Sequence, residues 1–525
     1  MSPASSFSAL APERAEASHS PLRLAPRHLG ARHAAILIPE PGARHFLAAP
    51  RGWRLTAAGR LIAEGAARRA LLILDGLLPG AEHLLELEGA EPLAFRAADC
   101  AGLADVSRFG AREGSEDNGA AIAAAMAAAG EGGTVLIPAG RWITGPVFLR
   151  SGLTLRLEEG ATLALTPDRS RIPILPARDG AGRMLASWEG LPEASYASLI
   201  TGIGLQKIAV TGLGALEGGG SAGDWWSWPK ETREGARRAR TIFLSRCEDV
   251  TLSGVTVRDS PSWTVHPLLC RRVSAFGLRI ENPPDSPNTD GFDPEMCAEV
   301  LLEGLHVSVG DDCVAVKAGK RGPQGESDHL APCSGLRIRH CLLERGHGGV
   351  VMGSEMSGGV RDVGIEDCDF LGTDRGLRIK TRRGRGGSVS DLRLSRSVMR
   401  RVETGISVNS FYFCDPDGTS DVVQSREPRP VDDLTPAVSG LRIEELRMEE
   451  VRVAAGAFFG LPESPLRGVE IRRLSVSYDA SPTGDVPDMA LNLPLLHHAG
   501  LVAQFADLTL EETEVPLSIL GEPSC

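Results

Sequence analysis

The chain has 525 residues, with 56 Lys and Arg against 68 Asp and Glu, and therefore a net charge of -12 at pH 7. A net-acidic chain lacks the broad basic field that attracts nucleic acids, so we expect no nucleic-acid partner. No apolar run reaches the ~18–20 residues needed to cross a bilayer, so we expect no membrane partner. The N-terminal stretch lacks the basic and apolar regions of a secretory signal, which favours a cytoplasmic location over a periplasmic or secreted one.

Residues 1–100 differ in pattern from the rest of the chain. Short apolar runs, such as AAILIP, GWRLTAAG, ALLILDG and HLLELEG, are separated there by Gly, Pro and charged residues. Runs of this length and spacing are typical of short strands. We therefore predict a small N-terminal β-domain, sandwich-like and possibly fibronectin-like, over residues 1–100.

An Ala-rich stretch follows, from Asn118 to Ala129. Alanine has the highest helix propensity, and Asp117 or Asn118 can cap the first turn, so this stretch predicts a helix that ends at Gly130. The TVLIP run after it predicts the first strand of the next region.

From about residue 150 the chain repeats itself. Segments that alternate apolar and polar residues begin at Val250, Val273, Val300, Leu336 and Val363, and further ones precede and follow them. Most of these starts are about 23–29 residues apart, which leaves no room for a long helix and indicates stacked β-coils. A propeller would need about 40–50 residues a blade and fits worse. Residues 101–525 are therefore predicted to form an all-β solenoid.

The ten cysteines contain no CxxC pair, so the sequence carries no zinc or redox signature. Small buried thiols are the favoured interpretation, ahead of disulfides.

Acidic residues cluster at equivalent points of two consecutive coils. The first group is the NTDGFD motif, which contains Asn288 and Asp290, and the second is GDDC, which contains Asp311 and Asp312. Asp312 follows Asp290 by 22 residues, close to one coil, so the two carboxylates should lie on adjacent strands about 5 Å apart. Carboxylates this close repel, and one should keep its proton near neutral pH.

A protonated acid beside an ionised carboxylate is the arrangement that glycoside hydrolysis needs. The alternatives are turn-forming aspartates or a calcium site. On the predicted spacing alone, catalysis and calcium binding are about equally favoured.

A histidine and a group of cations fall on the next two coils. His347 lies in the motif GHGG, and the segment from Arg375 to Arg385 holds six cationic residues in an acidic protein. Within it, Arg378 and Lys380 are two residues apart on a predicted strand, so both side chains point to the same face. Such a pair suggests an anionic ligand.

In this order and spacing, NTDGFD, GDDC, GHGG and RIK resemble the polygalacturonases of glycoside hydrolase family 28. The resemblance covers roughly residues 103–480 and includes the segments SPSWTVHP and FYFCDPDG. It implies a right-handed parallel β-helix that hydrolyses α-1,4-galacturonan with inversion. The additional N-terminal domain resembles that of some exo-acting bacterial members.

The resemblance also implies a role for each acidic residue. Asp311 would be the general acid, and Asp290 and Asp312 would activate the water. His347 would hold the protonation and geometry of the acid. No metal and no cofactor are required by this mechanism.

Further residues would bind the sugar. Arg378 and Lys380 would bind a galacturonate carboxylate at the cleavage site, and Tyr412 is the nearest candidate for the tyrosine that the family places one coil later. His266 and Glu355 would line the far end of the cleft. Asn288, in the first acidic motif, completes the predicted substrate-binding residues.

The expected partner is thus an acidic oligosaccharide or polysaccharide, cut in the exo mode if loops 320–333 and 414–438 close one end of the cleft. Rhamnogalacturonan or xylogalacturonan hydrolysis is an alternative within the family. A pectate lyase would need calcium ligands and an arginine base instead. A non-catalytic sugar-binding solenoid would have no reason to carry three carboxylates at one-coil spacing beside an Arg-Ile-Lys strand.

Overall fold

The structure, a computed structural model, describes residues 21–520. The chain divides into two compact units, Met1–Asp99 and Cys100–Cys525. Within the described residues no helix combines the length and apolar character needed to cross a membrane.

The first unit consists of two antiparallel sheets. The three-stranded sheet has the order β1 (Ala25–Leu29), β2 (His33–Leu37), β5 (Leu71–Asp75). The four-stranded sheet has the order β4 (Arg60–Arg69), β3 (Phe46–Ala57), β6 (Glu82–Leu87), β7 (Leu93–Arg96). In β6 buried and exposed residues alternate, as expected of a strand with one face on a core. The predicted N-terminal β-domain is confirmed as a pair of small antiparallel sheets.

The second unit begins with β8 (Leu103–Asp105) and the predicted helix, α1 (Gly119–Ala129). Asn118 is the N-cap residue of the helix but makes no capping hydrogen bond with its side chain; the Asp117 carboxylate, one residue earlier, accepts a hydrogen bond from Gly119 N at 2.8 Å. The Asn118 side chain instead bonds to Arg112 N and Ile143 O. Helix α1 covers the start of the solenoid core with Ile122 and other apolar side chains.

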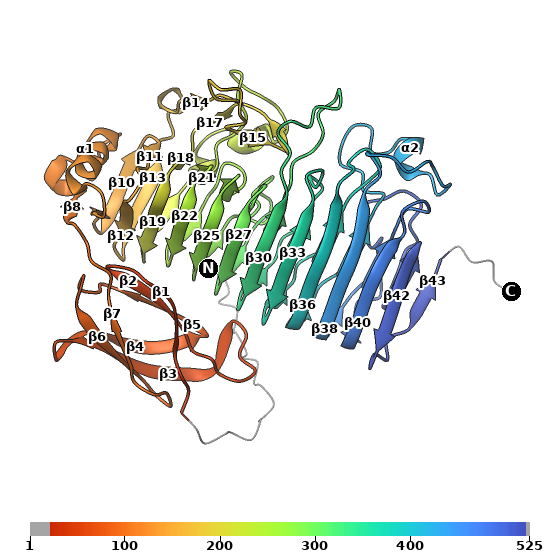
Figure 1. The fold of residues 1–525 in the computed structure, drawn as a ribbon, viewed down its shortest axis with the longest axis horizontal. Coiled ribbons are helices and arrows are strands. Elements are labelled where there is room, and N and C mark those ends of the chain that lie inside the picture. Colours follow the sequence, from red (N-terminus) through yellow and green to blue (C-terminus); the bar gives the residue numbers. More distant parts are fainter. Residues whose placement is uncertain (1–20, 521–525) are drawn as a thin grey trace. The chain divides into compact units, whose positions relative to one another are not determined.

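Parallel strands then stack along the whole solenoid (Figure 1). The long sheet has 21 strands. After β8 these are β9 (Thr134–Ile137), β10 (Gly140–Thr144), β12 (Thr154–Leu157), β13 (Ala161–Leu165), β19 (Gln206–Gly212), β20 (Ala215–Glu217), β22 (Glu248–Ser253), β23 (Thr256–Arg258), β25 (Arg271–Phe276), β26 (Arg279–Glu281), β27 (Ala298–Glu303), β28 (His306–Ser308), β30 (Cys333–Arg339), β31 (Leu342–Glu344), β33 (Val360–Glu366), β34 (Asp369–Leu371), β36 (Ser388–Arg400), β38 (Ala437–Val451), β40 (Leu466–Tyr478) and β42 (Ala506–Glu511).

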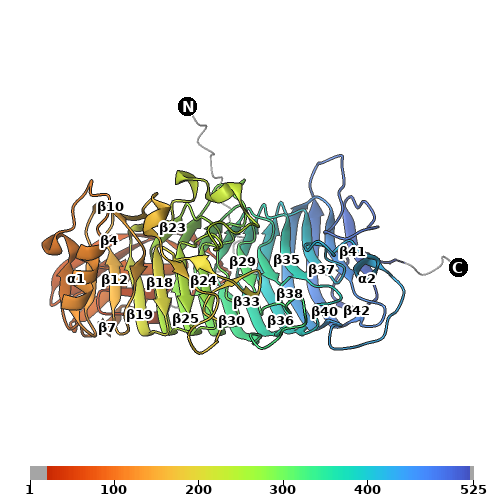
Figure 2. The same cartoon turned by 90° about the horizontal axis from the view of Figure 1, so that it is seen from above.

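A second parallel sheet, here called the cleft sheet, carries the site. Its strands are β11 (Val147–Phe148), β18 (Ile200–Ile203), β21 (Ile242–Ser245), β24 (Val265–Leu268), β29 (Val314–Val316), β32 (Val350–Met352), β35 (Arg375–Lys380), β37 (Thr404–Asn409), β39 (Ala454–Phe459), β41 (Ala499–Gln504) and β43 (Leu517–Ile519). Single bridges of Phe292 to Val265 and to Val314 join β24 to β29. Figure 2 shows strands of this sheet side by side.

The coils stack in register, so that similar residues of neighbouring coils lie above one another. In the long sheet Val250, Val273, Val300, Leu336 and Val363 pair in turn, and each is at most 2% exposed. Burial of these ladders drives the stacking, because each aliphatic side chain contributes about 1.5–3 kcal/mol when fully buried. The parallel β-helix predicted from the repeat is confirmed.

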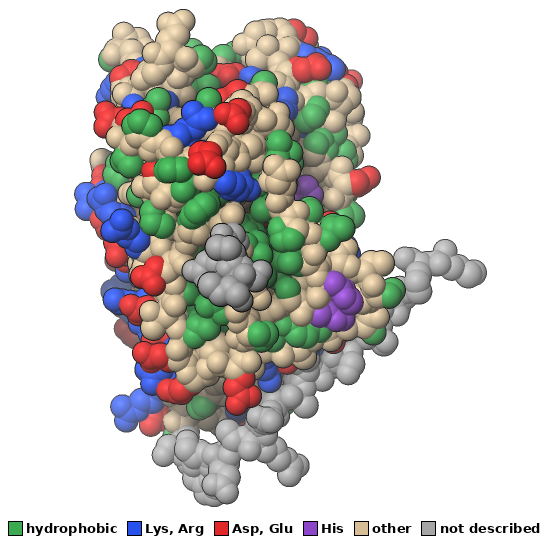
Figure 3. Space-filling view, turned by 90° about the vertical axis from the view of Figure 1, so that its right-hand side faces the viewer, with side chains coloured by type: hydrophobic (Ala, Val, Ile, Leu, Met, Phe, Trp, Pro, Cys, Tyr) green, Lys and Arg blue, Asp and Glu red, His purple; other side chains and the backbone are tan. Residues whose placement is uncertain are grey.

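Connections between coils leave the solenoid mainly around the cleft sheet. The segment from residue 166 to 199 carries the short strands β14 (Ile174–Leu175), β15 (Ser187–Trp188), β16 (Leu191–Pro192) and β17 (Ser195–Tyr196), and later connections carry four-residue α2 (Asp421–Gln424). Both stand at the top of Figure 1. The last strand, β43, ends the cleft sheet. Figure 3 shows that end of the molecule, where apolar side chains reach the surface. Ile519 in β43, for example, is 47% exposed.

Candidate active site

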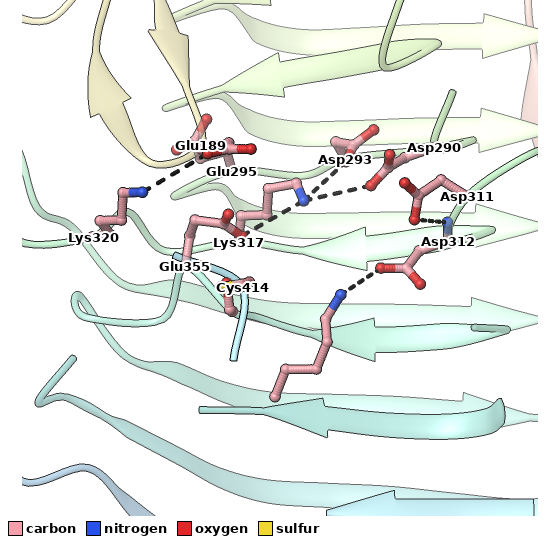
Figure 4. Close-up of polar contacts among 12 residues, drawn as sticks. Glu189, Asp290, Asp293, Glu295, Asp311, Asp312, Lys317, Lys320, Glu355 and Cys414 are labelled. Atoms are coloured by element: carbon pink, nitrogen blue, oxygen red, sulfur yellow. Dashed lines mark hydrogen bonds and ion pairs between the residues drawn. The ribbon is translucent and has the colours of Figure 1, made fainter. Parts of the chain in front are cut away.

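Three carboxylates meet where the NTDGFD turn joins the cleft sheet. Gly291 N donates to Asp312 O at 2.9 Å, so Asp290 and Asp312 lie in step on adjacent coils, as their spacing predicts. One carboxylate oxygen from each of Asp290, Asp311 and Asp312 lies within 4.8 Å of the others. Figure 4 shows the three side chains facing one another.

Asp290 is buried and has a raised pKa. Its side chain is 5% exposed, and Lys317 Nζ lies 3.5 Å from its Oδ2. Burial, and next the negative charge of Asp311, raise the pKa of Asp290 to about 7. The cluster therefore holds a proton at Asp290 up to near-neutral pH, as expected when carboxylates are crowded.

Asp311 faces outward, with 23% of its side chain exposed, and contacts the half-exposed His347. The distance from His347 Nδ1 to Asp311 Oδ1 is 3.5 Å. Burial alone would raise the pKa of Asp311, but the interaction with His347 outweighs it and lowers that pKa to about 2. The same interaction raises the pKa of His347 to about 9, so the imidazole is protonated at neutral pH. A proton thus lies beside the one carboxylate that faces the cleft.

The glycines of GHGG allow this close approach. Gly346 has a φ of 94°, and a Cβ on it would lie 2.2 Å from Asp311 O. A Cβ on Gly348 would lie 3.0 Å from Asp312 Oδ1. Larger residues at either position would push the His347 loop away from the carboxylates.

The pH dependence of activity should report this proton. We expect kcat/KM to rise as the pH rises through about 7, where Asp290 loses its proton and can act as a base. His347→Gln removes a positive charge beside the carboxylates, so they hold the proton more tightly and the acidic limb moves to higher pH. Full pH profiles of both enzymes measure the shift. His306→Gln is the control, because His306 pairs with Glu344 in the long sheet; a limb unmoved in His347→Gln contradicts this assignment.

Lys380 belongs to the same cluster. Its Nζ donates to Asp312 Oδ2 at 2.8 Å, and both side chains are at most 10% exposed. Asp312 also holds Asp311 in place, since Asp312 N donates to Asp311 Oδ1 at 3.0 Å. Lys380 therefore neutralises the Asp312 carboxylate directly.

Arg378 is paired differently from the prediction. It was expected to be free to bind a sugar carboxylate, yet its Nη2 donates to Asp488 Oδ1 at 2.5 Å, and its side chain is only 4% exposed. The carboxylate of Asp488 thus binds the guanidinium group of Arg378, where the sequence analysis predicted a substrate carboxylate. Arg378 and Lys380 do lie on one face of β35, because both are within 5.4 Å of the centre of the Tyr412 ring.

The structure contradicts the predicted place of His266. It was expected to line the cleft, but it is fully buried, and its Nε2 lies 2.9 Å from Glu295 Oε2. The ring also packs edge-on against Trp263 at 4.9 Å. Burial lowers the pKa of His266 to about 4, so it is neutral. It supports the wall of the site from inside and cannot contact a sugar.

Glu355 and Asn288 border the cluster from two other sides. Glu355 Oε2 lies 3.7 Å from Lys317 Nζ, and this lysine overcomes the effect of burial and lowers the pKa of Glu355 to about 2. Asn288 Oδ1 accepts a hydrogen bond from buried Arg238 at 2.6 Å. Glu355, predicted for the far end of the cleft, thus contacts the lysine that pairs with Asp290, and both Glu355 and Asn288 are engaged by protein groups.

The carboxylates are closer together than is usual for an inverting site. A separation of about 6.5–9.5 Å between acid and base is common in inverting glycosidases, whereas the nearest oxygens here lie within 4.8 Å. The cause is the stacking of Asp290 on Asp312 at strand spacing, with Asp311 adjacent in sequence. Such a cluster can chelate a cation, but Lys317 and Lys380 already bring two positive charges to it.

The structure adds residues that the sequence analysis did not single out: Lys317, Arg238 and Asp488. Lys317 is a lone cation in the apolar run VAVKAG, which was a usable signal. Asp488 lies 110 residues from Arg378 in the chain, and no local pattern marks it.

The fold is a parallel β-helix, and its site combines clustered carboxylates, two lysines that pair with them and a protonated histidine. These features define a carbohydrate-cleaving enzyme. The comparisons agree. The model of the glycosyl hydrolases family 28 matches residues 183–425. A probable polygalacturonase from Vitis vinifera is 33% identical over 66% of this chain and 67% of that protein. An endo-polygalacturonase from Pectobacterium carotovorum is 28% identical over 54% of this chain and 69% of its own.

Solved structures agree on the fold. The family 28 exopolygalacturonase of Yersinia enterocolitica has a TM-score of 0.67 and 18% identity, with 96% of each chain covered. The exopolygalacturonase of Thermotoga maritima has a TM-score of 0.64 and 24% identity, over 79% of this chain and 91% of its own. The chain belongs to glycoside hydrolase family 28 and is a glycosidase of the polygalacturonase type.

Proposed function

We propose that the protein is an exo-acting hydrolase of α-1,4-galacturonosyl linkages in pectate or oligogalacturonides. The carrying observation is the cluster of Asp290, Asp311 and Asp312 within 4.8 Å beside protonated His347. The names of the relatives, most of them polygalacturonases, support galacturonan as the substrate.

In this proposal Asp311 donates the proton to the leaving oxygen, because it is the only one of the three carboxylates with substantial exposure. Its low pKa in the free site reflects the ion pair with His347. Transfer of that proton from the imidazolium to Asp311 gives a neutral histidine and a protonated acid with the same total charge. Asp290 and Asp312, held by Lys317 and Lys380, then orient and deprotonate the water.

The walls of the cleft support exo action. On one side, loop 320–333 meets the 166–199 segment: Lys320 N donates to Gly190 O at 3.0 Å, and Arg178 pairs with Asp328 at 2.7 Å. Lys320 also reaches Asp415, in the second predicted loop, at 3.2 Å. On the other side, residues 485–491 lie over β37. Segments that flank the site on two sides favour a chain end over an internal bond.

Galacturonan oligomers of defined length, labelled at the reducing end, test the mode of cutting. We expect one short product released from one end, at every chain length. A spread of internal fragments at early times would contradict exo action, and no cleavage of any galacturonan would contradict the substrate.

We expect inversion, so the first product of an α-linked substrate should be the β-anomer. This prediction rests on the family, because the short separation of the carboxylates by itself resembles retaining sites. Proton NMR of the nascent reducing end distinguishes the two. An initial α-anomer would show that one of the aspartates acts as a nucleophile.

A further inference from the structure

The connection between β40 and β41 crosses the outer face of the cleft sheet. Its residues 485–491, here called the strap, are held at the base by Asp485 and Leu496, which exchange two backbone hydrogen bonds of 3.0 and 2.9 Å. Met489 O accepts from Asn409 Nδ2 at 3.0 Å and from Phe413 N at 3.3 Å. The strap therefore runs over β37, one coil beyond Arg378.

An apolar cluster lies beneath the strap. On the outward faces of β39 and β41, Phe459 and Val502 pack with Ala490 of the strap and with Leu493 and Leu496 after it. The strap therefore covers an apolar surface on these last coils.

Asp488 is the strap residue that reaches back toward the triad. Its carboxylate accepts from Arg378 Nη2 at 2.5 Å and from Arg378 Nε at 3.4 Å, and Ser407 Oγ also donates to it. Asp488 is 1% exposed and Arg378 3%. This is a fork-shaped, charge-assisted pair of the kind that arginine makes with a uronate carboxylate.

The backbone around Asp488 is fixed as well. Arg375 Nε donates to Pro487 O at 3.0 Å, and Thr404 Oγ1 donates to the same oxygen at 3.3 Å. Met489 N donates to Asp488 Oδ1 at 2.7 Å. Hydrogen bonds thus fix both the side chain and the neighbouring backbone of Asp488.

We infer that Asp488 determines specificity by placing the protein's own carboxylate where Arg378 would otherwise bind a uronate. With Lys380 paired to Asp312 and Arg378 to Asp488, neither of these two cations keeps an unpaired charge. The sugar on this side of the scissile bond is then bound without a carboxylate contact at Arg378, and it can be a neutral or esterified residue. The inference rests on the proposed function, because it concerns a subsite of the same cleft.

Calorimetric titration with free galacturonate tests this, because it needs no turnover. Asp488→Ala frees Arg378 and opens the space of one carboxylate, so we expect galacturonate to bind about tenfold to a hundredfold tighter than to the unmodified enzyme. The gain should vanish in Asp488→Ala/Arg378→Met, and galactose, which has no carboxylate, should bind alike to all forms. Asp485→Ala is the matched control: it removes a strap carboxylate that pairs with Arg452 and should not change galacturonate binding.

Asp488→Asn guards against a variant that fails to fold, since it keeps the shape of the side chain while removing its charge, and a smaller gain is expected. Equal galacturonate affinity in the unmodified enzyme and both folded variants would overturn the inference. So would weaker binding on Arg378→Met in the unmodified enzyme, because Arg378 would then already bind the sugar. If the unmodified enzyme cleaved no galacturonan yet Asp488→Ala gained affinity, the proposed function would fail and the inference would stand.

Discussion

Asp311→Asn is expected to lower kcat by about 10²–10⁴-fold, the usual contribution of a general acid. The amide matches the carboxylate in shape and can still accept from Asp312 N, as Asp311 Oδ1 does at 3.0 Å. It cannot carry a proton from His347 to the leaving oxygen. Turnover on an oligogalacturonide, measured at the pH optimum of the unmodified enzyme, gives the loss.

Asp285→Asn provides the control for this variant, because Asp285 is exposed on the turn before Asp290. It should leave kcat unchanged. Retention of more than about a tenth of turnover by Asp311→Asn would mean that another group protonates the leaving oxygen, and Asp290, with its pKa near 7, would be the next candidate.

Lys317→Met is expected to lower the free energy of unfolding by about 3–5 kcal/mol, as when one partner of a buried ion pair is removed. Lys317 Nζ lies 3.5 Å from Asp290, 3.4 Å from Asp293 and 3.7 Å from Glu355, and its side chain is 5% exposed. Neither carboxylate oxygen of Asp293 has a hydrogen-bond partner among the described residues. The cation that pairs with this carboxylate is Lys317. Methionine fills the space but leaves these carboxylates without a counter-charge.

Urea denaturation at pH 7 measures this effect. Lys230→Met is the matched control, because Lys230 also pairs with a glutamate, Glu189 at 3.4 Å, yet is 59% exposed, and we expect a loss of at most about 1 kcal/mol. Equal midpoints for the two variants would show that the buried carboxylates take up protons at little cost. Lowering the pH should partly restore Lys317→Met, since protonation of Asp290 and Asp293, whose pKa values burial raises, removes their charge.

The fold and the centre of the site were predictable because both follow the period of the coils. A strand repeat predicts stacking, and the 22-residue interval from Asp290 to Asp312 then predicts their contact. The same reasoning misplaced His266, because alternation along a strand does not show whether a later loop buries the polar face. The partner of Arg378 was not predictable either, since Asp488 lies in an aperiodic connection whose path depends on the packing beneath it.

The strap also bears on the order in which the protein can become active. In a solenoid each coil contacts mainly its neighbours, so folding can propagate along the stack, and the triad can form once the coils up to β35 are in place. Arg378 then lacks the carboxylate of Asp488 until β40 is complete and the strap folds back over β37. During synthesis, the three aspartates and His347 would be in place while about a hundred further residues, up to Asp488, were still to emerge. Correct assembly of the groove is thus a late event, governed by the C-terminal coils and not by the coils that carry the chemistry.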